Sequence, residues 1–328
     1  MKKLLLFPFI FGLSVFSSCF ANNKFVVYFG GWEGSEFDLN SKLAANVTAV
    51  NLAFANITSQ YQVDTAASGY LTNIPAPNIQ LQPTYINWTT YKYHHPNTKI
   101  ILSVGGATYS SIWTQILTPN SADTIARNIA KIVNQTYPAY KNQFSYPSDL
   151  LDNVTIDGVD IDAETGDVRL SETIANNVIA LITDLRKYLQ PGKLITLAGF
   201  SVGADPIDNC TVPGSVHCGE NISILQQAGN LLDWVNVMAY DAGKDYATSK
   251  YQIALANYTK YLGYEKTVLG LDIQNQWPGF QETAAQLADK ATWQRQHQFG
   301  GVMFWGVNVN NTPNQEKTYV DAISERLN

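Results

Sequence analysis

The stretch Val154-Thr155-Ile156-Asp157-Gly158-Val159-Asp160-Ile161-Asp162-Ala163-Glu164 decides how this chain of 328 residues is interpreted. Its last three carboxylates, those of Asp160, Asp162 and Glu164, alternate with apolar residues. In a β-strand, residues two apart leave the same face, so the three acidic groups would share one face at intervals of about 6.5 Å. Each negative charge raises the pKa of its neighbours, which makes the arrangement costly. We therefore expect it to serve acid catalysis, with one carboxyl kept protonated near neutral pH.

Two interpretations without catalysis compete with this one. The stretch could be an acidic, solvent-exposed edge strand that buries only its apolar face. It could also be a calcium loop beginning at Asp160. Such a loop needs Gly at its sixth position and Glu at its twelfth, where this chain has Thr165 and Ser171. The catalytic interpretation is preferred.

Eight short apolar or β-branched runs extend through the chain, with polar or helical segments between them. Helices are predicted from Ser171 to just before Pro191-Gly192, and near residues 121–136 and 281–297. The eight runs span residues 25–29, 47–54, 99–104, 154–163, 194–200, 234–240, 267–273 and 301–307. Strands that are apolar throughout and alternate with helices are typical of a parallel α/β sheet, and eight of them favour a single (β/α)8 TIM barrel.

An open doubly wound sheet is the alternative architecture. It is disfavoured because no Gly-x-Gly-x-x-Gly pattern follows the first run to mark a dinucleotide crevice. In the barrel, the acidic stretch would end the fourth strand. Catalytic groups of such barrels lie at the carboxyl ends of the strands.

The N-terminus carries the features of a targeting segment. Lys2 and Lys3 precede a short apolar stretch, Leu4–Phe16, and Ala21 follows as a plausible last residue before cleavage. This pattern predicts a signal peptide over residues 1–21 and a secreted or periplasmic protein. Cys19 leaves an alternative open, namely a membrane-anchored lipoprotein. No later run reaches about 18 uninterrupted apolar residues, so no membrane span is expected.

Charge and cysteine content narrow the possible partners. The formal net charge is −6 and no run is rich in Lys or Arg, which argues against nucleic acid as a partner. A neutral, hydroxyl-rich ligand fits, because 12% of the residues are aromatic and can stack on sugars. Cys210 and Cys218 are expected to form a disulfide after export, with two free thiols as the alternative. No His or Cys spacing indicates a metal site, and no cofactor is expected.

The acidic stretch resembles the catalytic signature of glycoside hydrolase family 18, the chitinases and related endo-β-N-acetylglucosaminidases. Three further motifs agree with that family in order and spacing. They are Ser103-Val-Gly105-Gly106, Met238-Ala-Tyr240-Asp241 and Gly301-Val-Met-Phe-Trp305. The resemblance covers about residues 24–328 and implies one catalytic domain.

The resemblance also implies a mechanism. Glu164 would protonate the glycosidic oxygen while the substrate's own acetamido carbonyl attacks the anomeric carbon with retention of configuration. Asp162 would stabilise the resulting oxazolinium ion, and Asp160 would share a proton with Asp162. Tyr240 would bond the acetamido oxygen. The remaining residues assigned to substrate binding are Tyr28, Phe54, Gly106, Met238, Asp241 and Trp305.

Two positions depart from the family pattern, since Ala107 and Thr165 stand where many members have aromatic residues. Stacking is then expected from Tyr109, Trp113 or Trp277. About 27 residues separate the seventh run from the eighth, too few for the extra α+β domain of deep-cleft relatives. A shallow, open cleft favours endo-acting cleavage.

These expectations lead to a secreted, monomeric, endo-acting chitinase that hydrolyses β-1,4 bonds between N-acetylglucosamine units. An endo-β-N-acetylglucosaminidase acting on N-glycans or peptidoglycan is the enzymatic alternative, because specificity lies in the loops around the cleft. An inactive chitin-binding lectin on the same barrel is the non-enzymatic alternative. It is disfavoured because such proteins typically lose the acid.

Overall fold

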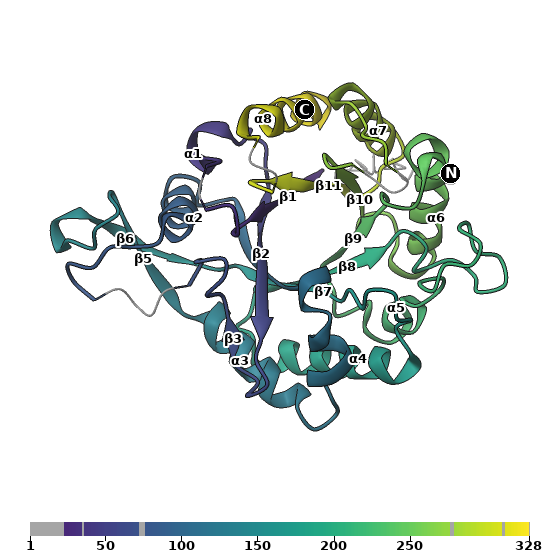
Figure 1. The fold of residues 1–328 in the computed structure, drawn as a ribbon, viewed down its shortest axis with the longest axis horizontal. Helices are drawn as coiled ribbons and strands as arrows, with labels where there is room; N and C mark the ends of the chain where they lie inside the picture. The colour runs from purple at the N-terminus through teal and green to yellow at the C-terminus, as the bar shows by residue number, and fades with distance from the viewer. Residues whose placement is uncertain (1–22, 35, 72–75, 276–278, 310–311, 328) are drawn as a thin grey trace, which may run out of the picture.

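Eight parallel strands form a closed barrel at the centre of the molecule (Figure 1). The structure is a computed structural model, and it describes residues 23–34, 36–71, 76–275, 279–309 and 312–327. The strands pair in chain order, and β1 pairs with both β11 and β2, which closes the ring. The barrel strands are β1 (Lys24–Gly30), β2 (Ala49–Ile57), β4 (Lys99–Gly105), β7 (Gly158–Asp162), β8 (Leu194–Phe200), β9 (Trp234–Met238), β10 (Thr267–Asp272) and β11 (Gly301–Val307).

Helices surround the barrel on its outside, as Figure 1 shows. They are α1 (Leu39–Lys42), α2 (Pro83–His94), α3 (Ala122–Asn134), α4 (Glu172–Tyr188), α5 (Ile222–Ala228), α6 (Tyr251–Leu262), α7 (Ala284–Gln296) and α8 (Pro313–Leu327). The helix predicted to begin at Ser171 is confirmed, because the Ser171 hydroxyl caps α4 by accepting from the Ile174 N–H at 3.3 Å. Helix α7 begins with a capping box between Thr283 and Gln286.

The predicted (β/α)8 TIM barrel is thus confirmed. Among the described residues between β10 and β11, the only helix is α7. The described residues also include short helical segments at Ala107–Tyr109, Ile112–Ile116, Pro147–Asp149 and Tyr246–Lys250.

One predicted strand has wrong bounds. Residues 154–163 were expected to form a single strand, but the chain divides there into β6 (Leu150–Thr155) and β7. Strand β6 pairs antiparallel with β5 (Thr136–Tyr140) in a hairpin that projects from the barrel (Figure 1). The short strand β3 (Val63–Asp64) likewise extends β2 antiparallel. The apolar pattern of 154–163 is continuous because the end of the hairpin is itself partly buried, so pattern alone does not show the break.

The core has two layers. The larger lies between the strands and the helices, where residues such as Val159 and Ile161 of β7 point outward from the barrel and are fully buried. The smaller fills the barrel interior with apolar side chains that include Val26, Ile101 and Met303. Polar inward residues interrupt this second layer on β4, β7, β8 and β9, and they mark where the site begins.

The predicted disulfide between Cys210 and Cys218 is confirmed, with Cα atoms 5.9 Å apart. It closes a loop between β8 and α5.

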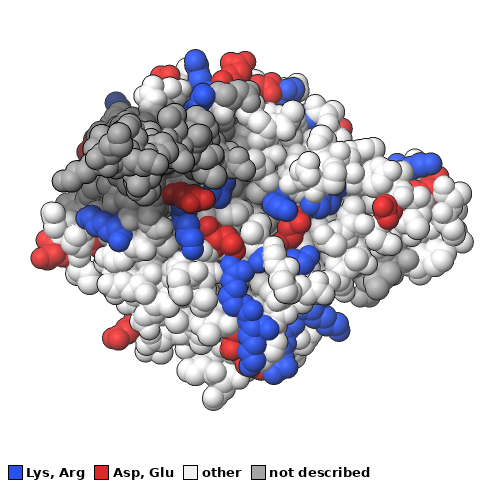
Figure 2. Space-filling model, turned by 180° about the vertical axis from the view of Figure 1, so that it is seen from behind, with Lys and Arg blue, Asp and Glu red and all other residues white. Residues whose placement is uncertain are grey.

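None of the helices in the described part of the chain is both long and apolar enough to cross a membrane. Figure 2 shows the face opposite to Figure 1, where basic and acidic groups lie side by side and much of the described surface is uncharged. The expected signal peptide and Cys19 lie outside the described residues.

Candidate active site

Strand register brings a set of polar side chains together inside the barrel. Ser103 of β4, Asp160 of β7 and Thr196 of β8 occupy the same level on three neighbouring strands. The Ser103 hydroxyl donates to Asp160 Oδ2 at 2.8 Å, and the Thr196 hydroxyl donates to Oδ1. From other strands, the Tyr28 hydroxyl donates to Oδ2 at 2.7 Å and the Asn236 amide to Oδ1 at 3.5 Å. Asp160 is therefore fixed in the barrel interior by four donors.

Burial and hydrogen bonding act in opposite directions on Asp160. Burial raises the pKa of its carboxyl, while the donors from Thr196, Tyr28, Ser103 and Asn236 lower it, and the net shift is upward. Its hydrogen bonds orient it without any contact to solvent. We conclude that Asp160 supports the residue above it on the strand rather than meeting a ligand directly.

Asp162 is the last residue of β7 on the same face as Asp160, and Glu164 follows just beyond the strand. Asp162 is buried, and burial together with the charges of Glu164 and Asp160 raises its pKa well above the usual range. Its Oδ1 atom has no hydrogen-bond partner among the described side chains. Burial also raises the pKa of Glu164, with Asp241 adding to the effect and the Ala107 N–H opposing it. An acid that keeps its proton to higher pH is suited to proton donation.

A cavity of about 560 Å³ opens over these carboxylates. Trp305 lies at its base, in a stacked contact with Phe54 at 5.6 Å between ring centroids and an edge contact with Tyr28 at 5.6 Å. Trp32 stacks on Phe54 at 6.2 Å, and 43% of its surface is exposed at the rim. The cavity thus combines an aromatic wall with acidic groups, which suits a sugar whose apolar ring face and hydroxyl groups both need partners.

Another part of the lining comes from residues at and just after the ends of β9 and β10. Tyr240 lies against Gly270, where an added Cβ would come within 3.0 Å of the tyrosine ring. Burial raises the pKa of Tyr240 well above its usual range, and the nearby carboxylates, Asp272 foremost, add to this. Asp272 is buried too, and burial raises its pKa to about 8. Tyr240 therefore stays a neutral hydrogen-bonding group at physiological pH.

Most residues singled out from the sequence meet at this cavity. Lining side chains include Glu164, Asp162, Tyr240, Asp241, Met238, Tyr28, Phe54, Trp305 and Tyr109. Gly106 contributes differently. Its N–H donates to the Asp162 carbonyl at 2.9 Å, and an added Cβ would meet the Phe54 ring at 2.6 Å. Gly106 therefore lets the backbone and Phe54 approach closely.

Of the aromatic residues expected to stack on the substrate, one is buried elsewhere and another lies outside the described residues. Trp113 is buried against Gly105 in the layer between strands and helices, so the structure places it away from the cavity. Trp277 lies outside the described residues. Trp32 and Gln274 also line the cavity, and neither is among the residues predicted from the sequence. The position of Trp32 directly after Gly30-Gly31, at the end of the first strand, was the available signal.

One group in the described part of the chain has the spacing of metal ligands, formed by Asp205, Cys210 and Cys218. The two sulfur atoms belong to the disulfide. The Asp205 carboxylate accepts from the Thr211 N–H at 2.8 Å and the Asn257 amide at 2.7 Å. These contacts give the group a structural role.

An acid beyond the carboxyl end of a (β/α)8 barrel strand, in a cavity with aromatic side chains, is compatible with a glycoside hydrolase. The profile of glycosyl hydrolases family 18 matches residues 24–271, and the chain belongs to this family. It is therefore a glycoside hydrolase. The comparison with curated proteins finds no match.

Solved structures of similar fold are numerous. A chitinase from Rhizomucor miehei is 17% identical, with a TM-score of 0.58, over 93% of this chain and 100% of that chain. A catalytic domain of the Ostrinia furnacalis group II chitinase, in complex with an N-acetylchitooligosaccharide, is 12% identical, with a TM-score of 0.63 over 93% and 96%. A fungal family 18 endo-β-N-acetylglucosaminidase is 19% identical, with a TM-score of 0.61 over 92% and 96%. At these identities the likeness establishes the fold.

Proposed function

We propose that this protein is a secreted, endo-acting chitinase that cleaves β-1,4 bonds between N-acetylglucosamine units with retention of configuration. The observation that carries the proposal is that Asp160 and Asp162 lie on one face of β7, and that Asp162 and Glu164 line an aromatic-lined cavity of about 560 Å³. The aromatic floor supplies a surface for the sugar ring, and the carboxylates supply the acid and the counter-charge.

Glu164 is the proton donor in this proposal. It lies at the cavity with its pKa raised by burial, and it is the carboxyl of the three nearest to solvent. It protonates the glycosidic oxygen as the bond to the anomeric carbon breaks. The leaving sugar departs as an alcohol, and Glu164, now a carboxylate, later takes a proton from the water that opens the intermediate.

Asp162 and Tyr240 act on the acetamido group of the substrate. The acetamido carbonyl oxygen bonds to the anomeric carbon, and a positive charge develops on the oxazolinium ring. Asp162, whose Oδ1 has no other hydrogen-bond partner among the described residues, accepts the acetamido N–H. The Tyr240 hydroxyl donates to the acetamido oxygen from another part of the cavity lining. Because Asp160 is buried beside Asp162, its own charge state tunes this step.

The substrate class rests on the acetamido chemistry together with the floor formed by Trp305 and Phe54. The solved complex of the Ostrinia furnacalis domain with an N-acetylchitooligosaccharide supports a chitin-type substrate for this chain. The endo mode is supported by the short connection between β10 and β11, which leaves room for a long polymer. An endo-β-N-acetylglucosaminidase activity is the second candidate, favoured by the similarity to the fungal enzyme.

A product profile separates the candidates. The protein is incubated with chitin pentamer and hexamer, an N-glycoprotein and peptidoglycan, and the products are measured by mass spectrometry. A chitinase should release short N-acetylglucosamine oligomers from internal bonds of the chitin substrates and leave the glycoprotein intact. Release of whole N-glycans with no cleavage of chitin oligomers would support the second candidate and overturn the first.

A further inference from the structure

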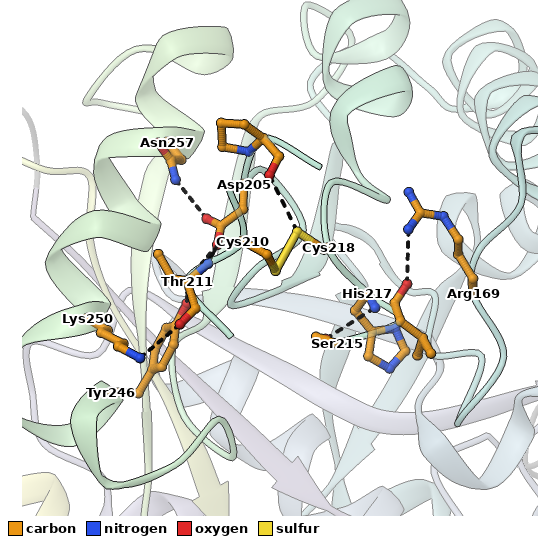
Figure 3. Close-up of a disulfide and its surroundings, with 12 residues drawn as sticks. Arg169, Asp205, Cys210, Thr211, Ser215, His217, Cys218, Tyr246, Lys250 and Asn257 are labelled. Carbon is orange, nitrogen blue, oxygen red and sulfur yellow. Dashed lines mark hydrogen bonds between the residues drawn. A yellow bond between two sulfur atoms is a disulfide. The ribbon is translucent and has the colours of Figure 1, made fainter. Parts of the chain in front are cut away.

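The loop between β8 and α5 is closed by a disulfide and anchored to its neighbours. Cys210–Cys218 closes it, and the Asp205 carboxylate ties its first part to α6 through the Asn257 amide at 2.7 Å (Figure 3). His217 directly precedes Cys218 on the other side of the disulfide, where the Arg169 guanidinium donates to the Val216 carbonyl at 3.4 Å. The loop is therefore held at both ends, and the position of His217 follows from these anchors.

Two contacts fix the imidazole of His217. Its Nδ1 atom lies 3.0 Å from Glu220 Oε2, and its ring stacks on Phe200 with centroids 3.9 Å apart and planes 12° apart. The Glu220 side chain is fully buried, whereas 18% of the His217 side chain is exposed. Glu220 Oε2 also accepts from the Leu170 N–H at 3.2 Å, in the segment that follows Glu164. The His217–Glu220 pair thus joins the loop to the segment after β7.

The pair lies beyond the carboxyl end of the strand next to the acidic motif. Asp162 pairs with Ala198 on the neighbouring strand β8, and Glu164 and Phe200 each follow two residues later. The imidazole stacked on Phe200 therefore lies at the same end of the barrel as the acid. Burial makes the largest contribution to the pKa of Glu164 and raises it. The hydrogen bond from the Ala107 N–H lowers this pKa, and the charge of Asp241 raises it. Of the pair, His217 lowers the pKa of Glu164 and Glu220 raises it.

We propose that His217, held by Glu220 and Phe200 on the disulfide-closed loop, is a positioning residue that sets the electrostatic surroundings of Glu164. The inference rests on the proposed role of Glu164 as the acid and adds a second residue pair to it. The charged groups that face the acid are Asp162 from β7, Asp241 after β9, and the His217–Glu220 pair.

The sign of each substitution follows from electrostatics. A general acid must be protonated, so activity falls as pH rises through its pKa. His217 lowers the pKa of Glu164, so His217→Gln removes this contribution and should move the fall to higher pH. Glu220→Gln removes a negative charge and should move it to lower pH. The two substitutions act on one pair and should shift the profile in opposite directions.

The test is the pH dependence of kcat/KM on chitin pentamer, measured for the full oxidised protein and for His217→Gln, Glu220→Gln and the control His297→Gln. His297 is exposed at the end of α7 and lies outside the site. The expected result is an upward shift of the alkaline limb for His217→Gln, a downward shift for Glu220→Gln, and no shift for the control. If His217→Gln fails to fold, as judged by its thermal unfolding, the downward shift of Glu220→Gln alone decides.

Alkaline limbs that stay in place, or that move in the same direction for both variants, would overturn the inference. Glu164→Gln, assayed in parallel, separates this failure from a failure of the proposed function. An inactive Glu164→Gln with unmoved His217 and Glu220 profiles refutes the positioning role alone. A fully active Glu164→Gln refutes the acid assignment on which both rest.

Discussion

The Tyr28 hydroxyl donates to Asp160 Oδ2 at 2.7 Å and so joins the first strand of the barrel to the strand that carries the acidic motif. The two residues are 132 positions apart in the chain, and both are buried. Tyr28 also lines the cavity and has an edge contact with Trp305. One side chain therefore links the buried base of the acidic strand to the aromatic floor, so it contributes to both stability and activity.

Replacing Tyr28 with Phe tests this link. Asp160 would lose one donor while staying buried, so we expect the free energy of unfolding to fall by about 1 kcal/mol. Turnover should fall as well, because the carboxylate that supports Asp162 loses part of its orientation. Urea unfolding at pH 7 and kcat on chitin oligomers measure the two effects. Tyr264→Phe, at an exposed tyrosine away from the site, is the matched control and should change neither quantity. Unchanged stability in Tyr28→Phe would show that this hydrogen bond is dispensable.

Replacing Glu164 with Gln should lower kcat by a factor of about 100 or more, the usual scale for a lost general acid. The amide keeps the size of the side chain, so binding of chitin oligomers and the melting temperature should stay close to those of the unmodified protein. Calorimetric titration with a chitin pentamer checks binding, and Glu172→Gln on the exposed first turn of α4 is the control. Near-normal turnover in Glu164→Gln would mean that the acid assignment is wrong.

The raised pKa of Asp272 predicts how the free energy of unfolding varies with pH. Burial raises its pKa from 3.8 to about 8, so between these values the folded protein binds a proton that the unfolded chain releases. This contribution to stability is fully present below the unfolded pKa and is lost as pH rises through about 8. Asp272→Asn mimics the protonated form and should flatten the decline in the free energy of unfolding from pH 5 to 9. Urea unfolding across this range is the measurement. Asp289→Asn, at an exposed position, should leave the slope unchanged, and an equal slope in Asp272→Asn would contradict the prediction.

The Cys210–Cys218 disulfide should be visible in the mature protein as one linked peptide by mass spectrometry without reduction. Replacing both cysteines with Ser should lower the free energy of unfolding by about 2–3 kcal/mol, the scale expected for closing a short loop. Labelling of both thiols in the native protein would contradict the disulfide in solution. The same spectrum tests the predicted export, because it reports whether the chain begins at Asn22 or at a lipidated Cys19.

Much of the barrel could be predicted because each strand is short, apolar and bounded by polar segments. The runs at 194–200 and 301–307 coincide with β8 and β11. The hairpin of β5 and β6 could not be predicted from the sequence, because it is an insertion whose last residues continue the apolar pattern of β7. Antiparallel pairing between Thr136 and Thr155 depends on contacts across the hairpin, which local periodicity does not report.

Some residues of the candidate site could likewise be predicted from the sequence, and others could not. Asp160, Asp162 and Glu164 could be selected because alternating acids on an apolar strand are unusual. Trp113 was considered as a stacking residue, but Gly105 leaves a space that its indole fills, so it is buried. The His217–Glu220 pair was not found because its partner Phe200 lies on a different segment. Contacts made by loops thus escape sequence patterns, while the chemistry of a single strand does not.

The acetamido nucleophile is the most discriminating prediction of the proposed mechanism. A sugar with a plain hydroxyl at that carbon cannot form an oxazolinium ion, so cello-oligomers should be inert while chitin oligomers of equal length are cleaved with retention of configuration. A thiazoline analogue shaped like the intermediate should inhibit strongly, because a site complementary to a reactive species binds its mimic tightly. Tyr240→Phe should weaken both turnover and this inhibition, since both use the hydroxyl at the cavity wall, whereas Tyr93→Phe on the exposed surface should change neither. NMR of the released anomer and inhibition constants are the measurements. Inversion at the anomeric carbon, or efficient cleavage of cello-oligomers, would exclude the mechanism and remove the role assigned to Asp162.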